Sequence, residues 1–366
     1  MYNRIIYIFS LILVLKMSYS LKNKIRGCFV GSGSEGMQSK FICQKIIDLI
    51  PSTSTASTTK AANVLYIGTA TYDLPAARMK QTSAFKELGC DINDLSVSNP
   101  SSSSYDSYDE MKEKVRKADI IIASGGNTLY MIDTWKHRGL SELIQEAATR
   151  GCILCGGSAG AIAWFDAGHS DSADPDSYQS AMIAEAQTIE KKDESSEAPK
   201  SAEDAKSWQY IRAPCLGLLP GLVCPHHDRT QSNGKPRADD FDKMLIERCQ
   251  NERGIGIDHY AAILLDGTGG YEVLKIPDKP GSVLIGANSS DNNDGIINEK
   301  DVCFTSNGDG IPGCWIKKVV NGNIVRSLVP SMGKVDDLLV EATGMTHEDE
   351  RVAAAREENP INKQNL

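Results

Sequence analysis

Ser158 lies in the run Gly156-Gly157-Ser158-Ala159-Gly160, directly after the short apolar stretch Cys152-Ile153-Leu154-Cys155. Glycines two positions before and after a serine have the spacing of a nucleophile elbow, where a strand reverses sharply into a helix. The small residues relieve the crowding of the backbone at that turn. The pattern predicts an exposed serine hydroxyl with the amide of Ala159 beside it, at the N-terminal end of the following helix.

A serine hydroxyl needs a base with a pKa near neutral pH before it becomes a good nucleophile. The segment Leu222-Val223-Cys224-Pro225-His226-His227-Asp228 has the form of a strand that runs into a loop, and the chain contains only six histidines. His226 therefore lies where a second active-site loop is expected, and we interpret it as the general base.

A catalytic histidine in turn needs a carboxylate that holds its tautomer and stabilises the imidazolium. The segment between the serine and the histidine offers Asp171 and Asp174, and Asp258 follows later in the chain. Gly126 lies on the loop before the elbow, so its amide is expected to join that of Ala159 in an oxyanion hole.

The elements that position these residues alternate between short apolar runs and longer amphipathic segments. The expected strands are 26–31, 63–68, 91–97, 119–123 and 152–155, and the expected helices are 37–50, 79–88, 108–116 and the segment 128–150. This alternation predicts a three-layer α/β sandwich with a mostly parallel sheet. Reactive loops gather at the carboxyl ends of such strands, and both Gly126 and Ser158 follow strands in this way.

The second half of the chain has a different texture. Residues 185–206 are rich in Glu, Lys, Ala and Ser without an apolar period, which predicts a solvated, disordered insertion. Shorter strands are expected at 254–265, 271–276, 282–286 and 315–325, the last around the turn Asn321-Gly322, and they predict an antiparallel extension of the same sheet. Residues 26–339 are thus expected to form one domain, and 344–366 a polar, loosely ordered tail.

Three motifs together resemble the peptidase S51 family, which includes dipeptidase E (the aspartyl dipeptidases) and the cyanophycinases. These motifs are Gly125-Gly126-Asn127-Thr128, Gly156-Gly157-Ser158-Ala159-Gly160 and Cys224-Pro225-His226. The resemblance covers roughly residues 26–339 and implies a flavodoxin-like fold related to the class I glutamine amidotransferases. In those amidotransferases a cysteine occupies the elbow, whereas here it is a serine.

The resemblance also implies roles for individual residues. Ser158 would be the nucleophile and His226 the general base, and Gly126 and Ala159 would donate to the oxyanion. Asp171 is the counterpart of the family's triad acid, with Asp174 and Asp258 as alternatives. Asn127 would contact the substrate, and Arg237 would grip the side chain of an N-terminal aspartate, because a guanidinium binds a carboxylate at two points. A structural surface arginine is the alternative interpretation of Arg237.

The implied activity is hydrolysis of small peptides, such as Asp-X dipeptides, through an acyl-enzyme. Two alternatives stay open: a non-catalytic amidotransferase-like binding protein that kept the elbow, and a hydrolase of β-linked Asp-Arg as in the cyanophycinases. The N-terminal segment, the acidic insertion and the longer C-terminal part depart from the dipeptidase pattern. The expected partners are a small peptide and, as one option, a second copy of the chain.

Composition limits the other classes of function. The chain has 366 residues, a net charge of −9 and 41% hydrophobic residues, an ordinary globular composition. The acidic balance, without clustered Lys and Arg, argues against nucleic acid as a partner. Arg4 followed by the apolar run 5–15 predicts a secretory signal over residues 1–20, and hence a secreted protein with no membrane association after cleavage. An uncleaved anchor and a cytoplasmic location are the alternatives.

Several motifs that suggest cofactors have simpler explanations. Gly31-Ser32-Gly33-Ser34-Glu35-Gly36 fits the dinucleotide-binding pattern, but no acidic residue closes the next strand, so a tight turn explains the glycines and no cofactor is expected. Residues 290–301 resemble a calcium loop without its first aspartate and final glutamate, and a polar turn is the alternative. Consecutive side chains on a strand diverge, so His226, His227 and Asp228 are not expected to share a metal ion. Cys152 and Cys155 face opposite sides of a strand, so no metal is expected there either.

Overall fold

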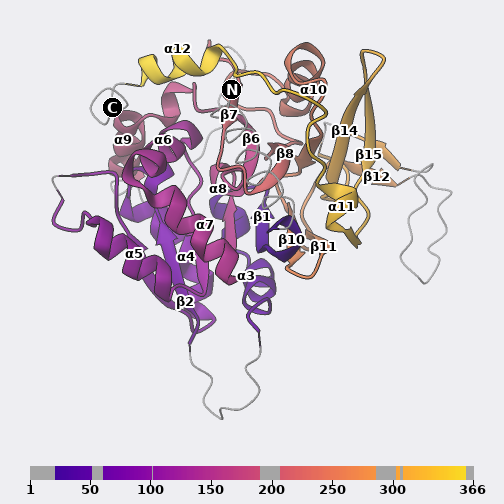
Figure 1. Ribbon diagram of the computed structural model, residues 1–366. Coiled ribbons are helices and arrows are strands. Elements are labelled where there is room, and N and C mark those ends of the chain that lie inside the picture. Colours follow the sequence, from indigo (N-terminus) through magenta and orange to yellow (C-terminus); the bar gives the residue numbers. More distant parts are fainter. Residues whose placement is uncertain are drawn as a thin grey trace, which may run out of the picture.

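The computed structural model describes residues 21–51, 61–100, 102–189, 207–285, 302–305 and 308–359. The signal predicted over residues 1–20, most of the predicted insertion (190–206) and the calcium-like segment 290–301 lie outside these residues. Within them the chain folds as a mixed α/β protein with helices on both faces of a large sheet, as the sequence predicts (Figure 1).

The large sheet has eight strands in the order β16-β11-β10-β1-β5-β4-β2-β3. The five strands from β1 to β3 in this order run parallel, and β10, β11 and β16 extend the sheet antiparallel beyond β1. The bounds are β1 Arg26–Val30, β2 Asn63–Ile67, β3 Asp91–Leu95, β4 Ile120–Ala123, β5 Ile153–Gly157, β10 Ala261–Asp266, β11 Gly270–Lys275 and β16 Met332–Lys334.

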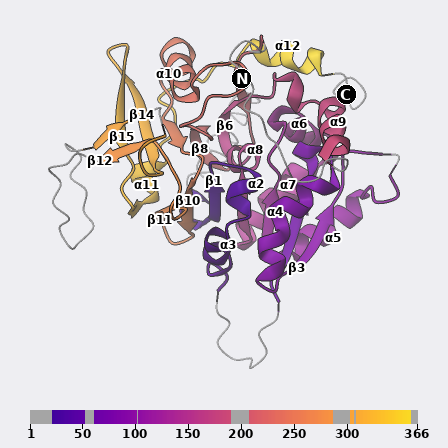
Figure 2. The same cartoon turned by 180° about the vertical axis from the view of Figure 1, so that it is seen from behind.

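Alternate residues of the central strands face two separate layers of helices. On β4, Ile121 and Ala123 join one buried cluster, whereas Ile120 and Ile122 join another on the opposite face. Helices α5, α6, α7 and α8 contribute to the first cluster, and α3 and α4 to the second (Figures 1 and 2). The same alternation places Cys152 and Cys155 on opposite faces, which confirms that they are buried core residues and not a paired site.

The helices of this half begin and end where the sequence provides caps. Ser107 and Glu110 form a reciprocal capping box at the start of α5, and Asn127 caps α6. The helical segment predicted over 128–150 is divided at Gly139, which adopts φ 70° between α6 and α7. The helix bounds are α2 Ser34–Met37, α3 Lys40–Ile47, α4 Pro75–Glu87, α5 Tyr108–Lys117, α6 Thr128–Arg138, α7 Leu140–Arg150, α8 Ala159–Ile162 and α9 Gln179–Ile189, with short 3-10 turns at Lys22–Lys24, Thr69–Thr71 and Pro175–Ser177.

A second sheet of six strands lies beside the first, in the order β15-β14-β9-β8-β6-β7. Its bounds are β6 Phe165–Ser170, β7 Ile211–Pro214, β8 Leu219–Cys224, β9 Gly254–Ile257, β14 Cys314–Val320 and β15 Asn323–Leu328. The prediction of a single strand over 254–265 is wrong. This segment contains β9, which lies in the second sheet, and β10, which lies in the large sheet. Three residues, 258–260, connect the two sheets at this point.

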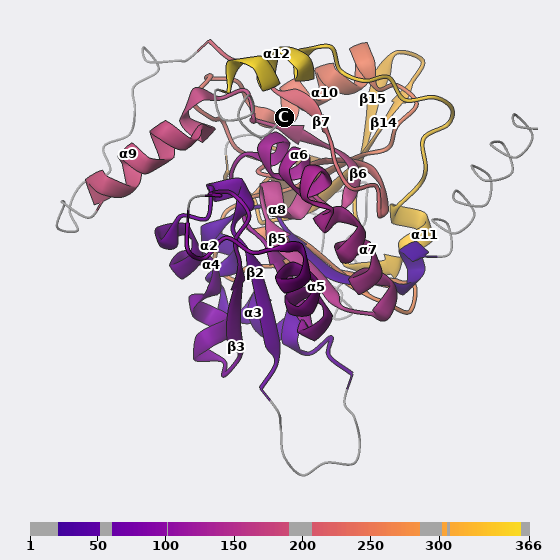
Figure 3. The same cartoon turned by 60° about the vertical axis from the view of Figure 1, so that its left-hand side comes forward.

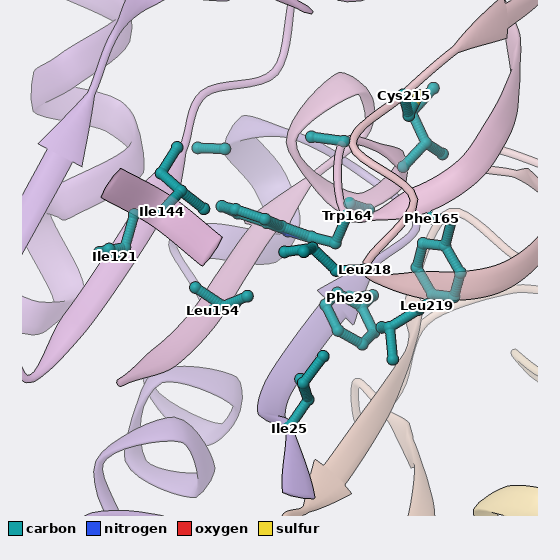
Figure 4. Packing of buried hydrophobic residues seen from close by; sticks show 14 of the residues in the cluster. Ile25, Phe29, Ile121, Ile144, Leu154, Trp164, Phe165, Cys215, Leu218 and Leu219 are labelled. Carbon is teal, nitrogen blue, oxygen red and sulfur yellow. The ribbon is translucent and has the colours of Figure 1, made fainter. Parts of the chain in front are cut away.

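The two sheets share one hydrophobic core. Phe29 of β1 packs edge-on against Phe165 of β6, with ring centroids 5.0 Å apart. Trp164 and Leu219 lie in the same cluster, which contains residues from both sheets (Figure 4). The strands of the second sheet are therefore held rigidly against the first, and so are the loops at their ends.

The described part of the predicted tail, residues 344–359, is more ordered than the sequence predicts. Residues Arg351–Glu358 form α12 (Figure 3). Its Val352 and Ala355 are buried in one cluster with Leu129 of α6. Arg356 forms two hydrogen bonds with Asp133. The remaining elements are α10 Arg237–Arg248, α11 Val335–Leu338, and the paired strands β12 Val283–Ile285 and β13 Val302–Phe304. Among the described residues, none of the helices combines the length and apolar composition that crossing a bilayer requires.

Candidate active site

Ser158 occupies a strained turn between β5 and α8. Its backbone has φ 56° and ψ −119°, a conformation that costs a non-glycine residue about 1–3 kcal/mol. The flanking glycines allow the turn to approach β4 closely. A Cβ on Gly156 would lie 2.4 Å from the carbonyl oxygen of Ala123, and a Cβ on Gly160 would lie 2.0 Å from the same atom. The elbow predicted from the spacing is therefore present, and it lifts the serine above the carboxyl edge of the sheet.

His226 follows β8 and meets the serine from the second sheet. Its Nε2 lies 2.9 Å from Ser158 Oγ. The residue has φ 48°, and its amide donates to the carbonyl of Gly31 at the end of β1. The predicted serine–histidine pair is thus brought together across the junction of the two sheets, with a second strained residue fixed by a backbone hydrogen bond.

The other ring nitrogen of His226 contacts a second histidine. His226 Nδ1 lies 2.7 Å from Nδ1 of His259, which is in the connection between β9 and β10. The Nε2 of His259 is paired with a carboxylate oxygen of Glu35 on α2, and the Tyr260 hydroxyl donates to the other oxygen at 3.1 Å. Neither His259 nor Glu35 is assigned to the site by the sequence analysis. The available signal for His259 was the polar segment 258–260, which interrupts the strand expected over 254–265.

Asp171 pairs with Arg237 and not, as the sequence analysis predicts, with His226. Its Oδ2 accepts a hydrogen bond from Arg237 at 3.0 Å, and in the described part of the chain no hydrogen bond links it to His226. Its charge still acts on the imidazole and raises the pKa of His226, against the larger effect of burial. The prediction that Asp171 holds the imidazole directly is wrong in this structure, because His259 occupies that side of the ring.

The two alternative acids have structural partners of their own. Asp174 caps the turn at Pro175–Ser177 and accepts a hydrogen bond from Ser232 at 2.6 Å. Asp258 is fully buried, accepts hydrogen bonds from Ser282 and Gly313, and contacts His227 instead of His226. Burial and the neighbouring charge of Asp228 raise the pKa of Asp258 to about 7.

Arg237 is not placed to bind a substrate. It is the first residue of α10 and only 1% exposed. Besides the ion pair with Asp171, its guanidinium donates to the carbonyl of His169 and to the side chain of Gln231, both at 2.7 Å. The expectation of a carboxylate clamp at this position is therefore wrong, and so is the surface alternative, since the residue is a buried cation held inside the fold.

Asn127 also points away from the reacting groups. Its side-chain oxygen accepts from the amide of Tyr130 to cap α6, and its amide group donates to Ser172 and Ser177. These contacts use the donors and the acceptor of the side chain, so Asn127 fixes the loop that carries Gly126 and does not line the cavity in front of Ser158.

A cavity of about 290 Å³ opens in front of the serine. Ser158, His226 and Gly126 line it, together with α4 residues that include Lys80 and with Met182 of α9. In the described part of the chain, neither the amide of Gly126 nor that of Ala159 donates a hydrogen bond to a protein acceptor. Both predicted oxyanion donors are therefore available to a ligand.

The electrostatics keep both histidines neutral near pH 7. Burial, followed by the positive charge of Arg237, lowers the pKa of His226 well below its usual range. Burial also lowers the pKa of His259, although Glu35 opposes this effect. A neutral imidazole can accept a proton, so His226 is available as a base at neutral pH and remains so under mildly acidic conditions.

The glycines of residues 31–36 have a structural explanation. A Cβ on Gly31 would lie 1.9 Å from the carbonyl oxygen of Asp258, where β1 passes the connection between the sheets. The loop carries Glu35 into the site and lines the cavity through Gly33 and Ser34. Within the described ranges, no three His, Cys, Asp or Glu side chains gather into a set that could hold a metal ion.

Comparison with known proteins now identifies the family. The profile of peptidase family S51 matches residues 30–273, which is more than half of the chain and includes Ser158, His226 and His259. The chain belongs to peptidase family S51. The family resemblance seen in the sequence motifs is confirmed, and the protein is a peptidase by its family.

The similar proteins differ in the share of this chain, and of their own length, over which they match it. A Trypanosoma brucei brucei protein named G2/mitotic-specific cyclin-1 is 28% identical over 87% of this chain and 89% of its own length. The uncharacterized peptidase YgaJ of Bacillus subtilis is 34% identical over 40% of this chain and 46% of its own length. The solved structure of a peptidase from an acI-B1 actinobacterium shares 21% identity, covers 70% of this chain and 89% of its own, and has a TM-score of 0.46.

Proposed function

We propose that this S51 family member is a serine-type peptidase that hydrolyses small peptides through an acyl-enzyme. The observation that carries the proposal is the 2.9 Å contact between Ser158 Oγ and His226 Nε2 at the mouth of a cavity. A strained nucleophile, a neutral imidazole in contact with it and two free amides beside it are the parts that acyl transfer requires.

The reaction divides into two proton-balanced halves. As Ser158 Oγ attacks the peptide carbonyl carbon, its proton passes to His226 Nε2, and the amides of Gly126 and Ala159 donate to the developing oxyanion. The intermediate collapses when His226 returns that proton to the leaving amine, which breaks the C–N bond and leaves an ester on Ser158. A water molecule then attacks the ester, with His226 again taking the proton and returning it to Ser158 Oγ.

The cavity favours a short substrate. Its volume of about 290 Å³ lies at the lower end of the range found for small-molecule pockets. Among the described residues that line it, Lys80 alone carries a permanent charge. We therefore assign the recognition of an acidic N-terminal side chain, as in Asp-X dipeptides, to Lys80 on α4 in place of Arg237.

The test compares Ser158→Ala with Ser103→Ala, a control that removes an exposed hydroxyl from the loop before α5. Hydrolysis of a dipeptide library should fall by about 10⁴-fold or more in the Ser158 variant, because removal of a triad nucleophile leaves only residual catalysis. The control should keep the parental rate. Equal rates in the parent and Ser158→Ala would refute the serine mechanism, and a parent that cleaves nothing in the library would favour a binding protein.

A further inference from the structure

Four side chains form an unbroken line of contacts from the nucleophile to the protein surface. Ser158 Oγ contacts His226 Nε2 at 2.9 Å, His226 Nδ1 contacts His259 Nδ1 at 2.7 Å, and His259 Nε2 is paired with Glu35. Glu35 lies at the outer end, with 57% of its side chain exposed, whereas only 12% of His259 is exposed. Four separate segments of the chain converge here, and His259 within the line is largely shielded from water.

The contacts of this line allow one consistent placement of hydrogens. If His226 Nε2 is to accept the serine proton, the hydrogen of the neutral His226 ring must be on Nδ1. It then donates to His259 Nδ1, which must be the acceptor, so the hydrogen of His259 must be on Nε2. That hydrogen points at the Glu35 carboxylate, which can only accept. Each contact therefore has one donor and one acceptor when Glu35 is ionised.

We propose that His259 and Glu35 are positioning residues that act together in place of a single triad acid, with the charge of Glu35 reaching His226 through the ring of His259. The inference rests on the proposed function and deepens it. It assigns the task of holding the His226 tautomer to a histidine, and the task of supplying negative charge to a carboxylate one residue further away.

The proton movement is balanced at every step. When the Oγ–H bond of Ser158 breaks and a bond to His226 Nε2 forms, His226 holds two protons and a positive charge. Its Nδ1 proton can then move along the 2.7 Å contact to His259 Nδ1, which leaves His226 neutral and places an imidazolium directly against Glu35. The return of this proton to His226 Nδ1 regenerates the His226 imidazolium, which then gives its Nε2 proton to the leaving amine.

Other charged groups face His226 and His259 and determine how strongly the charge of Glu35 affects the pKa values of the two rings. The positive charges of Arg237 and Arg229 lower the pKa of His226, and Arg229 also lowers that of His259. The negative charge of Asp171 raises the pKa of His226. The charges of Glu35 and Asp228 raise the pKa of His259, and Glu35 has the larger effect. Because Glu35 is half exposed, water weakens its field, and we expect an effect of about tenfold from its charge alone.

The placement of hydrogens can be measured without any substrate. In protein labelled with ¹⁵N-histidine, the nitrogen shifts at neutral pH should show His226 protonated on Nδ1 and His259 protonated on Nε2. The assignment of each ring follows from the loss of its signals in His226→Gln and His259→Gln. A His259 ring with its hydrogen on Nδ1 would overturn the proposal, because it could not accept from His226.

Kinetics then test the role in catalysis. We expect Glu35→Gln to lower kcat by about tenfold and His259→Gln by about 100-fold, with KM within twofold of the parent in both. The double variant should be no slower than His259→Gln, because the two residues act as a unit. Glu142→Gln, an exposed glutamate on α7, is the matched control and should change nothing.

The pH profile separates this role from a purely structural one. Because the two rings are in contact at 2.7 Å, we expect them to titrate as a coupled pair, and protonation of either ring removes the acceptor that the reaction needs. Loss of the negative charge in Glu35→Gln lowers the pKa of the pair further, so the acidic limb of kcat/KM should move to lower pH. A structural defect would reduce the rate and leave the limb in place, and that result would overturn the proposal.

Failure of this inference is distinguishable from failure of the proposed function. A parent that hydrolyses peptides while Glu35→Gln and His259→Gln both retain parental kcat refutes the relay and leaves the serine mechanism standing. A parent that neither hydrolyses peptides nor reacts with a fluorophosphonate probe refutes the function, and the catalytic role of the relay with it.

Discussion

Replacement of Asp171 by Asn separates a catalytic role for this residue from a structural one. The sequence pattern suggests that Asp171 is the triad acid, in which case the variant would lose about 10⁴-fold in kcat and keep its stability. In the structure Asp171 instead neutralises Arg237, which is 1% exposed and has two further, uncharged acceptors. We therefore expect Asp171→Asn to lose stability, with a loss of no more than about tenfold in kcat.

The size of the loss follows from the burial of the cation. Removal of one partner of a buried ion pair typically costs about 3–5 kcal/mol, because the other charge stays buried without compensation. The Asp171 side chain is 20% exposed and water can replace part of it, so the lower end, about 3 kcal/mol, applies here. For a chain of 366 residues that corresponds to a decrease in Tm of about 4 °C.

Thermal unfolding of the parent, Asp171→Asn and Asp174→Asn provides the measurement. Asp174 also caps a turn and accepts a hydrogen bond from Ser232, but it forms no ion pair with any described residue, so Asp174→Asn should unfold within about 1 °C of the parent. The double variant Asp171→Asn/Arg237→Met should recover most of the loss, since both charges are then gone. An Asp171→Asn variant with parental Tm and a 10⁴-fold lower kcat would refute this reasoning.

The pH dependence has a defined sign. Burial alone would raise the pKa of Asp171, but the charge of Arg237, with the hydrogen bonds from Gln231 and Arg237, outweighs it and lowers the pKa below its ordinary value. A lowered carboxyl pKa contributes stability that is complete above the unfolded-state value of about 3.9 and is lost as the pH falls through the folded-state value. The difference in Tm between parent and Asp171→Asn should therefore be the same at pH 7 and pH 5.

Two further predictions concern strain and substrate recognition. Ser158→Gly should unfold about 1 °C above Ser158→Ala in calorimetry. Both variants lack the hydroxyl, but only glycine removes the cost of φ 56°, a net gain of about 1 kcal/mol. A lower Tm for the glycine variant would contradict the strain. Lys80→Gln should raise KM about fivefold for dipeptides that begin with Asp and leave KM for neutral dipeptides unchanged, whereas Lys86→Gln, on the same helix, should alter neither. An equal effect of Lys80→Gln on both substrate classes would contradict its proposed role.

Much of the fold was predictable because local patterns determine it. The apolar run Ile120–Ile122 belongs to a strand buried on both faces, and the turn Asn321-Gly322 connects β14 and β15 with φ values of 51° and 75°. The spacing around Ser158 likewise predicted the elbow, and a histidine after a strand predicted its partner. In each case the information lies within a few consecutive residues.

The rest of the site depends on contacts between distant segments. His259 meets His226 only because the chain leaves one sheet after Ile257 and enters the other at Ala261, a division that apolar patterning alone does not reveal. Glu35 lies inside a glycine-rich turn that suggested a nucleotide site. Arg237 follows a histidine loop in the sequence as a substrate clamp would, but the start of α10 is buried, so its charge is directed inward.

The most direct test of the central claim is mass spectrometry of the protein after reaction with a fluorophosphonate. We predict one added phosphonyl group per chain, located by peptide mapping on Ser158, with none on Ser158→Ala and slower labelling of His226→Gln. Labelling of another serine, or equal labelling of the parent and Ser158→Ala, would contradict the assignment of this hydroxyl as the nucleophile.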